Sequence, residues 1–168
     1  QIKVRTERQY IPKYKPEKRY AVFVERKTIT HDMSELLFFT NGQVKFLSGQ
    51  YILLSVPGIK ETRAYSMSNI SNKNGQWEFH VKQVKYGKLS NVLLSSLSLG
   101  SKVNIDGPFG HAYVRTDNNR DVVCVAGGSG LGPMLSIVRH LANESSAKDR
   151  KINFFFRWPP TRGYDLQQ

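Results

Sequence analysis

Residues 121–141 read DVVCVAGGSGLGPMLSIVRHL, and this stretch decides how the second part of the chain folds. The apolar run Val122–Ala126 has the length and β-branched content of a buried strand. A glycine-rich turn, Gly127–Gly132, follows it, and Met134–Leu141 carries apolar residues at helical spacing. Because residues 151–156 form another apolar run, the pattern predicts a β-α-β unit.

Upstream of this stretch, the chain shows short apolar segments of period two separated by polar turns, which is typical of antiparallel strands. Six strands are predicted, at Tyr20–Lys27, Glu35–Thr40, Gln50–Val56, Arg63–Ser68, Trp77–Lys85 and Lys102–Ile105. Six such strands indicate an all-β, six-stranded antiparallel barrel. Between the last two strands, residues 90–97 have helical spacing, and Ser90 is expected to be the N-cap of that helix.

The two patterns meet at residues 116–120, a polar, turn-prone stretch where we place a domain boundary. We therefore expect a barrel over residues 19–116 and the start of an α/β nucleotide-binding domain over residues 121–168. One β-α-β unit needs about 30 residues or more, so the second region has room for a single unit. Since two parallel strands do not make a stable sheet, we expect this domain to be truncated.

Composition places the chain among globular proteins, because 39% of its 168 residues are hydrophobic and 11% are aromatic. No apolar run reaches the roughly 20 residues of a membrane span, and no signal peptide is recognisable, so we expect a cytoplasmic protein without membrane contact. Cys124 is the single cysteine, which excludes a disulfide or a cysteine metal cluster within this chain, and no metal site is expected.

The net charge of +12 would attract nucleic acid, so a basic nucleic-acid-binding β-barrel is one alternative function. Many of the cations lie between Lys3 and Arg19, among tyrosines and prolines and without a core-facing period. We interpret residues 1–18 as a solvated linker or docking segment.

Three motifs carry groups suited to phosphates or to a flat polar ring. The first, Arg63-Ala64-Tyr65-Ser66, places Arg63 and Tyr65 on one strand face, with a guanidinium fork for phosphate beside an aromatic ring. The second, Gly87-Lys88-Leu89-Ser90, offers free backbone N–H groups at a helix start. The third is the glycine turn that ends at Pro133.

In this order the motifs resemble the signature of the ferredoxin-reductase superfamily, especially the reductase components of bacterial multicomponent oxygenases. The resemblance implies that Arg63 holds the FAD pyrophosphate, that Tyr65 packs on the isoalloxazine, and that Ser66 lies near flavin N5 as the catalytic residue. It implies further cofactor-binding roles for His80, Val81, Lys82, Gly87, Lys88, Leu89, Ser90, Gly127, Gly128, Ser129, Gly130 and Pro133.

The function implied by this resemblance is a flavin-dependent reductase that passes electrons from NAD(P)H through FAD to an iron–sulfur centre and on to an oxygenase. The [2Fe-2S] cluster would belong to a partner or to a preceding ferredoxin domain, of which residues 1–18 would be the end. The choice between NADH and NADPH stays open. A flavin-binding module without turnover is the second alternative.

Overall fold

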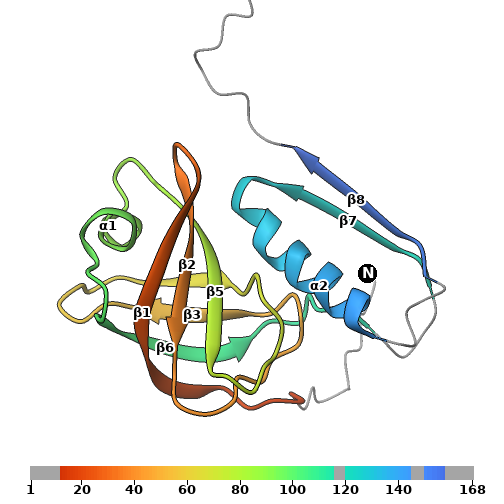
Figure 1. Cartoon of the computed structure of the whole chain (residues 1–168), viewed down its shortest axis with the longest axis horizontal. Helices are drawn as coiled ribbons and strands as arrows, with labels where there is room; N and C mark the ends of the chain where they lie inside the picture. Colours follow the sequence, from red (N-terminus) through yellow and green to blue (C-terminus); the bar gives the residue numbers. More distant parts are fainter. Residues whose placement is uncertain (1–11, 116–119, 145–149, 158–168) are drawn as a thin grey trace, which may run out of the picture.

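A computed structural model, which describes residues 12–115, 120–144 and 150–157, contains an antiparallel sheet followed by a β-α-β unit (Figure 1). All six predicted strands are present in the sheet, with ends shifted by a few residues. Their bounds are β1 Glu17–Thr30, β2 Met33–Phe39, β3 Tyr51–Ser55, β4 Thr62–Ser66, β5 Gln76–Lys82 and β6 Lys102–Phe109. The antiparallel prediction is confirmed for each pair of neighbouring strands.

The strand order is β4-β3-β6-β1-β2-β5, and Figure 1 shows β1, β2 and β5 crossing over β3 and β6. The prediction of a closed barrel is not confirmed, because β4 and β5 stand at opposite ends of this order. An isolated bridge between Met67 and Phe79 brings these two edges together at one point. The sheet stays open because β4 ends at Ser66, and the chain pairs with β5 only at the next residue, Met67, which no longer belongs to β4. An open seam therefore runs beside the bridge.

The core lies inside the curved sheet and follows the period-two pattern of the sequence. Phe38 packs against Phe23 and Phe79, with ring centroids 5.3 and 5.9 Å apart. Trp77 and Phe79 stack at the β5 edge, 6.3 Å apart. This aromatic cluster makes a rigid inner wall beneath the seam.

The helix expected at residues 90–97 begins earlier and changes type. Its first part, α1, spans Lys88–Asn91, and a π-helix follows at Val92–Ser96. The prediction that Ser90 is the N-cap is wrong, because Gly87 takes that position and Ser90 lies inside the helix. The Ser90 hydroxyl instead accepts a hydrogen bond from the Val84 N–H and donates one to the Gly87 carbonyl, both at 3.3 Å.

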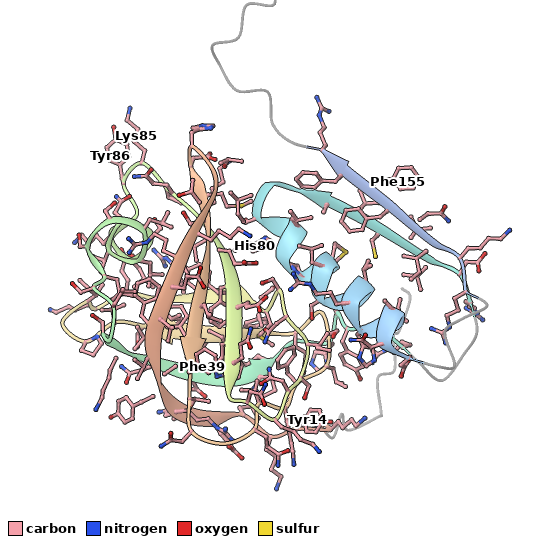
Figure 2. All side chains as sticks on the ribbon, in the orientation of Figure 1. Tyr14, Phe39, His80, Lys85, Tyr86 and Phe155 are labelled. Carbon is pink, nitrogen blue, oxygen red and sulfur yellow. The ribbon has the colours of Figure 1, made fainter. Side chains whose placement is uncertain are left out.

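The predicted β-α-β unit is confirmed, with β7 at Val122–Gly127, a 3₁₀ turn at Gly128–Gly130, α2 at Leu131–Asn143 and β8 at Ile152–Arg157. The two strands are parallel. As expected, Cys124 is buried, and this burial raises the pKa of its thiol. The expectation of buried strands holds for one face only: Val125 on β7 and Phe155 on β8, which Figure 2 labels, are exposed on the other face.

Residues 1–11 of the predicted linker 1–18 lie outside the described residues, as do most of the proposed boundary and the end of the chain after residue 157. The last two residues of the predicted linker, Glu17 and Lys18, belong to β1 instead. Among the described residues, no helix is both long and apolar enough to cross a membrane. Within the same residues, no cluster of three or more His, Cys, Asp or Glu side chains has a metal-binding arrangement.

Candidate functional site

The seam between β4 and β5 opens into a pocket of about 710 Å³, within the range of small-molecule and cofactor sites. Side chains and backbone from four places line it: β4, β5 with the loop that follows, the start of α1, and the glycine turn before α2. The lining residues are Glu61, Arg63, Ala64, Tyr65, Ser66, His80, Lys82, Gln83, Val84, Lys85, Gly87, Ser90, Ser129, Gly130 and Pro133. Residues far apart in the sequence thus share one wall.

Strand β4 supplies the arginine, the tyrosine and the serine of the first motif. Arg63 is 61% exposed, which leaves most of its guanidinium donors accessible from the pocket. The ring of Tyr65 is half-buried and lies 6.4 Å from that of Phe79, so it rests on the aromatic wall. Burial raises the pKa of Tyr65 to about 12, and its hydroxyl is therefore protonated at neutral pH.

The loop after β5 folds tightly around Gly87. A Cβ at this position would lie 2.6 Å from the Ser90 hydroxyl oxygen and 2.9 Å from the Val84 Cβ, so a larger residue would force the loop apart. Gly87 has an ordinary negative φ, and its requirement is close packing rather than unusual backbone geometry. The same loop carries Lys85 and Tyr86, which project outward near α1 in Figure 2.

The glycine turn enters the pocket from the other side. Gly128 has a φ of +55°, a left-handed conformation that favours glycine. Gly130 differs, since its φ of −62° suits any residue and nothing lies within 4 Å of a Cβ built there. The fold does not require glycine at residue 130, but a side chain there would extend into the pocket space.

Helix α2 holds this turn in place through a face made of small and polar residues. Gly132 packs against His80, and a Cβ on Gly132 would be 3.6 Å from the His80 Cβ. One turn further, Ser136 is buried, and its hydroxyl donates a 2.6 Å hydrogen bond to the Asn69 carbonyl. The opposite face of α2 contributes apolar side chains to the core of the β-α-β unit.

Arg139 continues that polar face. Its guanidinium donates to the Ser68 carbonyl at 3.0 Å and to the Glu78 carboxylate at 2.9 Å. Ser68 and Asn69 directly continue the segment that leaves β4. The position of α2 is consequently fixed against the same backbone that carries Tyr65 and Ser66.

His80 lies at the junction of β5 and α2, where Figure 2 labels it. Its side chain is 3% exposed, and its Nε2 lies 3.1 Å from a Glu35 carboxylate oxygen on the neighbouring strand. Its other ring nitrogen, Nδ1, is buried and has no hydrogen-bond partner among the described residues. The position fits the lining role predicted for this residue.

The structure brings most of the predicted site residues to the pocket wall, but not all of them. Five do not line it: Val81, Lys88, Leu89, Gly127 and Gly128. Val81 and Leu89 point their side chains into the core, although the backbone N–H of Leu89 remains relevant because it donates to Glu61. Sequence reasoning missed Glu61, Ala64 and residues 83–85; residues 83–85 lie between two recognised motifs, which was a usable signal.

The lining chemistry fits FAD. Arg63 and Lys82 offer cationic groups to a diphosphate, and Tyr65 offers a ring face to a flat heterocycle. At Gly87 a Cβ would collide with the loop, and at Gly130 a Cβ would fill part of the pocket, so glycine at both positions leaves this space free for a ligand. The volume also suits a ligand of several rings.

Family models match both parts of the chain. The model described as the oxidoreductase FAD-binding domain matches residues 20–113, and the one described as the ferric reductase NAD binding domain matches residues 119–159. Their junction agrees with the change of pattern in the sequence.

Two relatives extend the match across most of the chain. The ferredoxin–NAD(P)(+) reductase CarAd of Metapseudomonas resinovorans is 33% identical over 158 residues, which are 92% of this chain and 46% of that protein. The ferredoxin–NAD(+) reductase component of the alkene monooxygenase system of Xanthobacter autotrophicus is 39% identical over 74% of this chain and 38% of that protein. The chain thus spans less than half the length of either relative.

Among solved structures, the ferredoxin reductase in carbazole 1,9a-dioxygenase superposes with a TM-score of 0.82 at 30% identity. The superposition covers 88% of this chain and 44% of that structure.

Proposed function

This chain belongs to the family of oxidoreductase FAD-binding domains, whose model matches more than half of its length, and we propose that it forms the flavin-binding part of an NAD(P)H-dependent reductase serving an oxygenase. One of the relatives named above is the reductase component of an alkene monooxygenase system, and the similar solved structure is a ferredoxin reductase in carbazole 1,9a-dioxygenase. We further propose that residues 19–116 bind FAD and that residues 121–168 are the N-terminal part of a domain that binds the nicotinamide nucleotide.

One observation carries this proposal. The Arg63-Ala64-Tyr65-Ser66 strand and the glycine turn Ser129–Gly130, which lie more than sixty residues apart, line the same pocket. A nucleic-acid-binding barrel needs exposed aromatic residues along its strands and leaves this convergence unexplained. A flavin and a nicotinamide that must meet face to face require that the β4 motif and the glycine turn line the same pocket.

Each group in the pocket has a distinct task. Arg63 would neutralise the diphosphate of FAD, Tyr65 would cover one face of its ring system, and Ser66 would donate a hydrogen bond to ring nitrogen N5. When bound, FAD supplies hydride uptake from a reduced nicotinamide and the release of electrons one at a time. The protein orients the two rings and excludes water from their contact.

The electron acceptor that we propose is an iron–sulfur protein of the ferredoxin type, either a separate chain or a domain of a longer one. The excess of positive charge, +12 overall, suits an acidic partner of this kind. Electrons would continue from that partner to the oxygenase.

Anaerobic mixing of the FAD-loaded chain with NADH or NADPH tests the function. We expect loss of the flavin absorbance near about 450 nm, followed by its return when an oxidised [2Fe-2S] ferredoxin is added. Bound FAD that no nicotinamide bleaches would favour the flavin-binding module without turnover. That second candidate, the flavin-binding module without turnover, is favoured by the exposed outer face of β7 and β8, because parallel strands of nucleotide-binding sheets are normally covered on both faces. A chain that binds no FAD would contradict both.

A further inference from the structure

We propose that Glu61 competes with the FAD diphosphate for the donors of the pocket and thereby sets the affinity of this site for diphosphate-bearing ligands. The inference rests on the proposed function and concerns a residue outside the three motifs. Glu61 lies in the loop before β4 and lines the pocket.

The geometry places one carboxylate oxygen between two donors. Oε2 of Glu61 lies 3.5 Å from Nη2 of Arg63 and 3.4 Å from the backbone nitrogen of Leu89. Arg63 is the cation expected to hold the diphosphate, and Leu89 belongs to the second motif, Gly87-Lys88-Leu89-Ser90. An anionic oxygen of the protein thus occupies the point where these two elements converge.

A phosphate oxygen needs donors of the same kind, namely a guanidinium group and a backbone N–H. The contacts of Glu61 are long for hydrogen bonds, so they hold its carboxylate weakly. The side chain is also 27% exposed, which gives it room to turn toward water. A diphosphate can therefore displace Glu61, but it then binds beside a displaced negative charge.

A different role would have the opposite consequence. If Glu61 served to orient Arg63 for the ligand, its removal would leave the guanidinium less ordered and weaken FAD binding. Competition predicts stronger binding, so the sign of the change separates the two roles.

The test compares the unmodified chain with Glu61→Gln, which keeps the size of the side chain and removes its charge. Affinities are measured by quenching of flavin fluorescence for FAD and riboflavin, and by calorimetry for ADP. We expect about fivefold tighter binding of FAD and ADP, the ratio that repulsion between unit charges about 4 Å apart in water provides. Riboflavin carries no phosphate, and its affinity should not change.

Two further variants control the result. Glu25→Gln removes the same charge from an exposed residue of β1 and should leave all three affinities unchanged. Glu61→Asp keeps the charge on a shorter side chain that reaches the donors poorly, and should give an intermediate FAD affinity. Thermal unfolding of each variant confirms that it folds.

Unchanged or weaker FAD binding by Glu61→Gln, with normal binding by the unmodified chain, would overturn this inference and leave the proposed function intact. An equal gain for riboflavin would also overturn it, because the effect would then not involve the diphosphate. If neither chain bound FAD, the proposed function and the inference would both fail.

Discussion

The hydroxyl of Ser136 in α2 donates a 2.6 Å hydrogen bond to the backbone carbonyl of Asn69, in the segment that follows β4. Both residues are buried, so the bond forms away from water. It connects α2, which begins directly after the glycine turn, to the segment that follows the strand carrying Arg63 and Tyr65. The walls of the pocket are therefore held at a fixed separation.

Replacing Ser136 by alanine should weaken this connection. The Asn69 carbonyl would lose a buried partner, which costs about 1–3 kcal/mol. Chemical denaturation should show the loss, and a change below a few tenths of a kcal/mol would contradict the role of this bond.

The ion pair between Arg139 and Glu78 should affect the conformational order of the glycine turn more than overall stability, because the Arg139 side chain is 44% exposed and surface pairs contribute about 0–1 kcal/mol. Arg139→Gln should speed hydrogen exchange of the amides at residues 128–132, and the swapped pair Arg139→Glu with Glu78→Arg should restore much of the protection. His140→Gln, on the same helix but paired with Glu144, is the matched control. Equal acceleration in the control would argue against a specific role for Arg139.

Arg63→Ala should weaken FAD binding by more than tenfold, since hydrogen bonds to a charged group contribute about 1.5–3 kcal/mol each. Equilibrium dialysis with FAD measures the change. Arg19→Ala removes a cation from β1 outside this pocket and should retain FAD normally. Unchanged flavin occupancy in Arg63→Ala would mean that Arg63 does not hold the FAD diphosphate.

The two pocket glycines should respond differently to alanine. Gly87→Ala forces a Cβ against Ser90 and Val84 and should cost about 1–3 kcal/mol of stability, as overpacking does. Gly130→Ala meets no protein atom and should unfold like the parent chain, yet it should bind FAD or the nicotinamide less tightly. Thermal unfolding and ligand titration of both variants check this; a destabilised Gly130→Ala would show that the fold, not the ligand, requires that glycine.

Tyr65 should make stability depend on pH in the alkaline range. Burial raises the pKa of Tyr65 to about 12 from 10.0, so folding favours the neutral phenol. This contribution is complete below pH 10.0 and is lost as the pH rises toward about 12, because the unfolded chain ionises first. Denaturant unfolding across this window should show the parent chain losing stability relative to Tyr65→Phe. A constant difference between the two proteins would mean that Tyr65 does not titrate as described.

Much of the fold could be predicted from the sequence because local patterns determine it. The period-two segments gave six strands, and the glycine turn before an apolar helix gave the β-α-β unit. The closed barrel is not confirmed, because closure depends on where β4 ends relative to β5, which no local pattern specifies. Ser90 was mistaken for an N-cap because its hydroxyl bonds back to the preceding loop.

The site was predictable as far as its motifs extend. Arg63, Tyr65 and Ser66 do line one pocket with the glycine turn, as their residue types suggested. Glu61 could not be found in this way, because its importance lies in contacts with Arg63 and Leu89 that only the folded chain brings together. The same holds for Ser136 and Arg139, whose partners lie about 60 or more residues away.

Backbone amide NMR signals of the isotope-labelled chain, followed while FAD is added, locate the FAD site residue by residue. We expect the largest shifts to occur together at Arg63–Ser66, at Gly87 and at Ser129–Gly130, while residues at the opposite end of β1, such as Lys18, stay unchanged. Shifts confined to another surface, or no shifts at saturating FAD, would contradict this expectation.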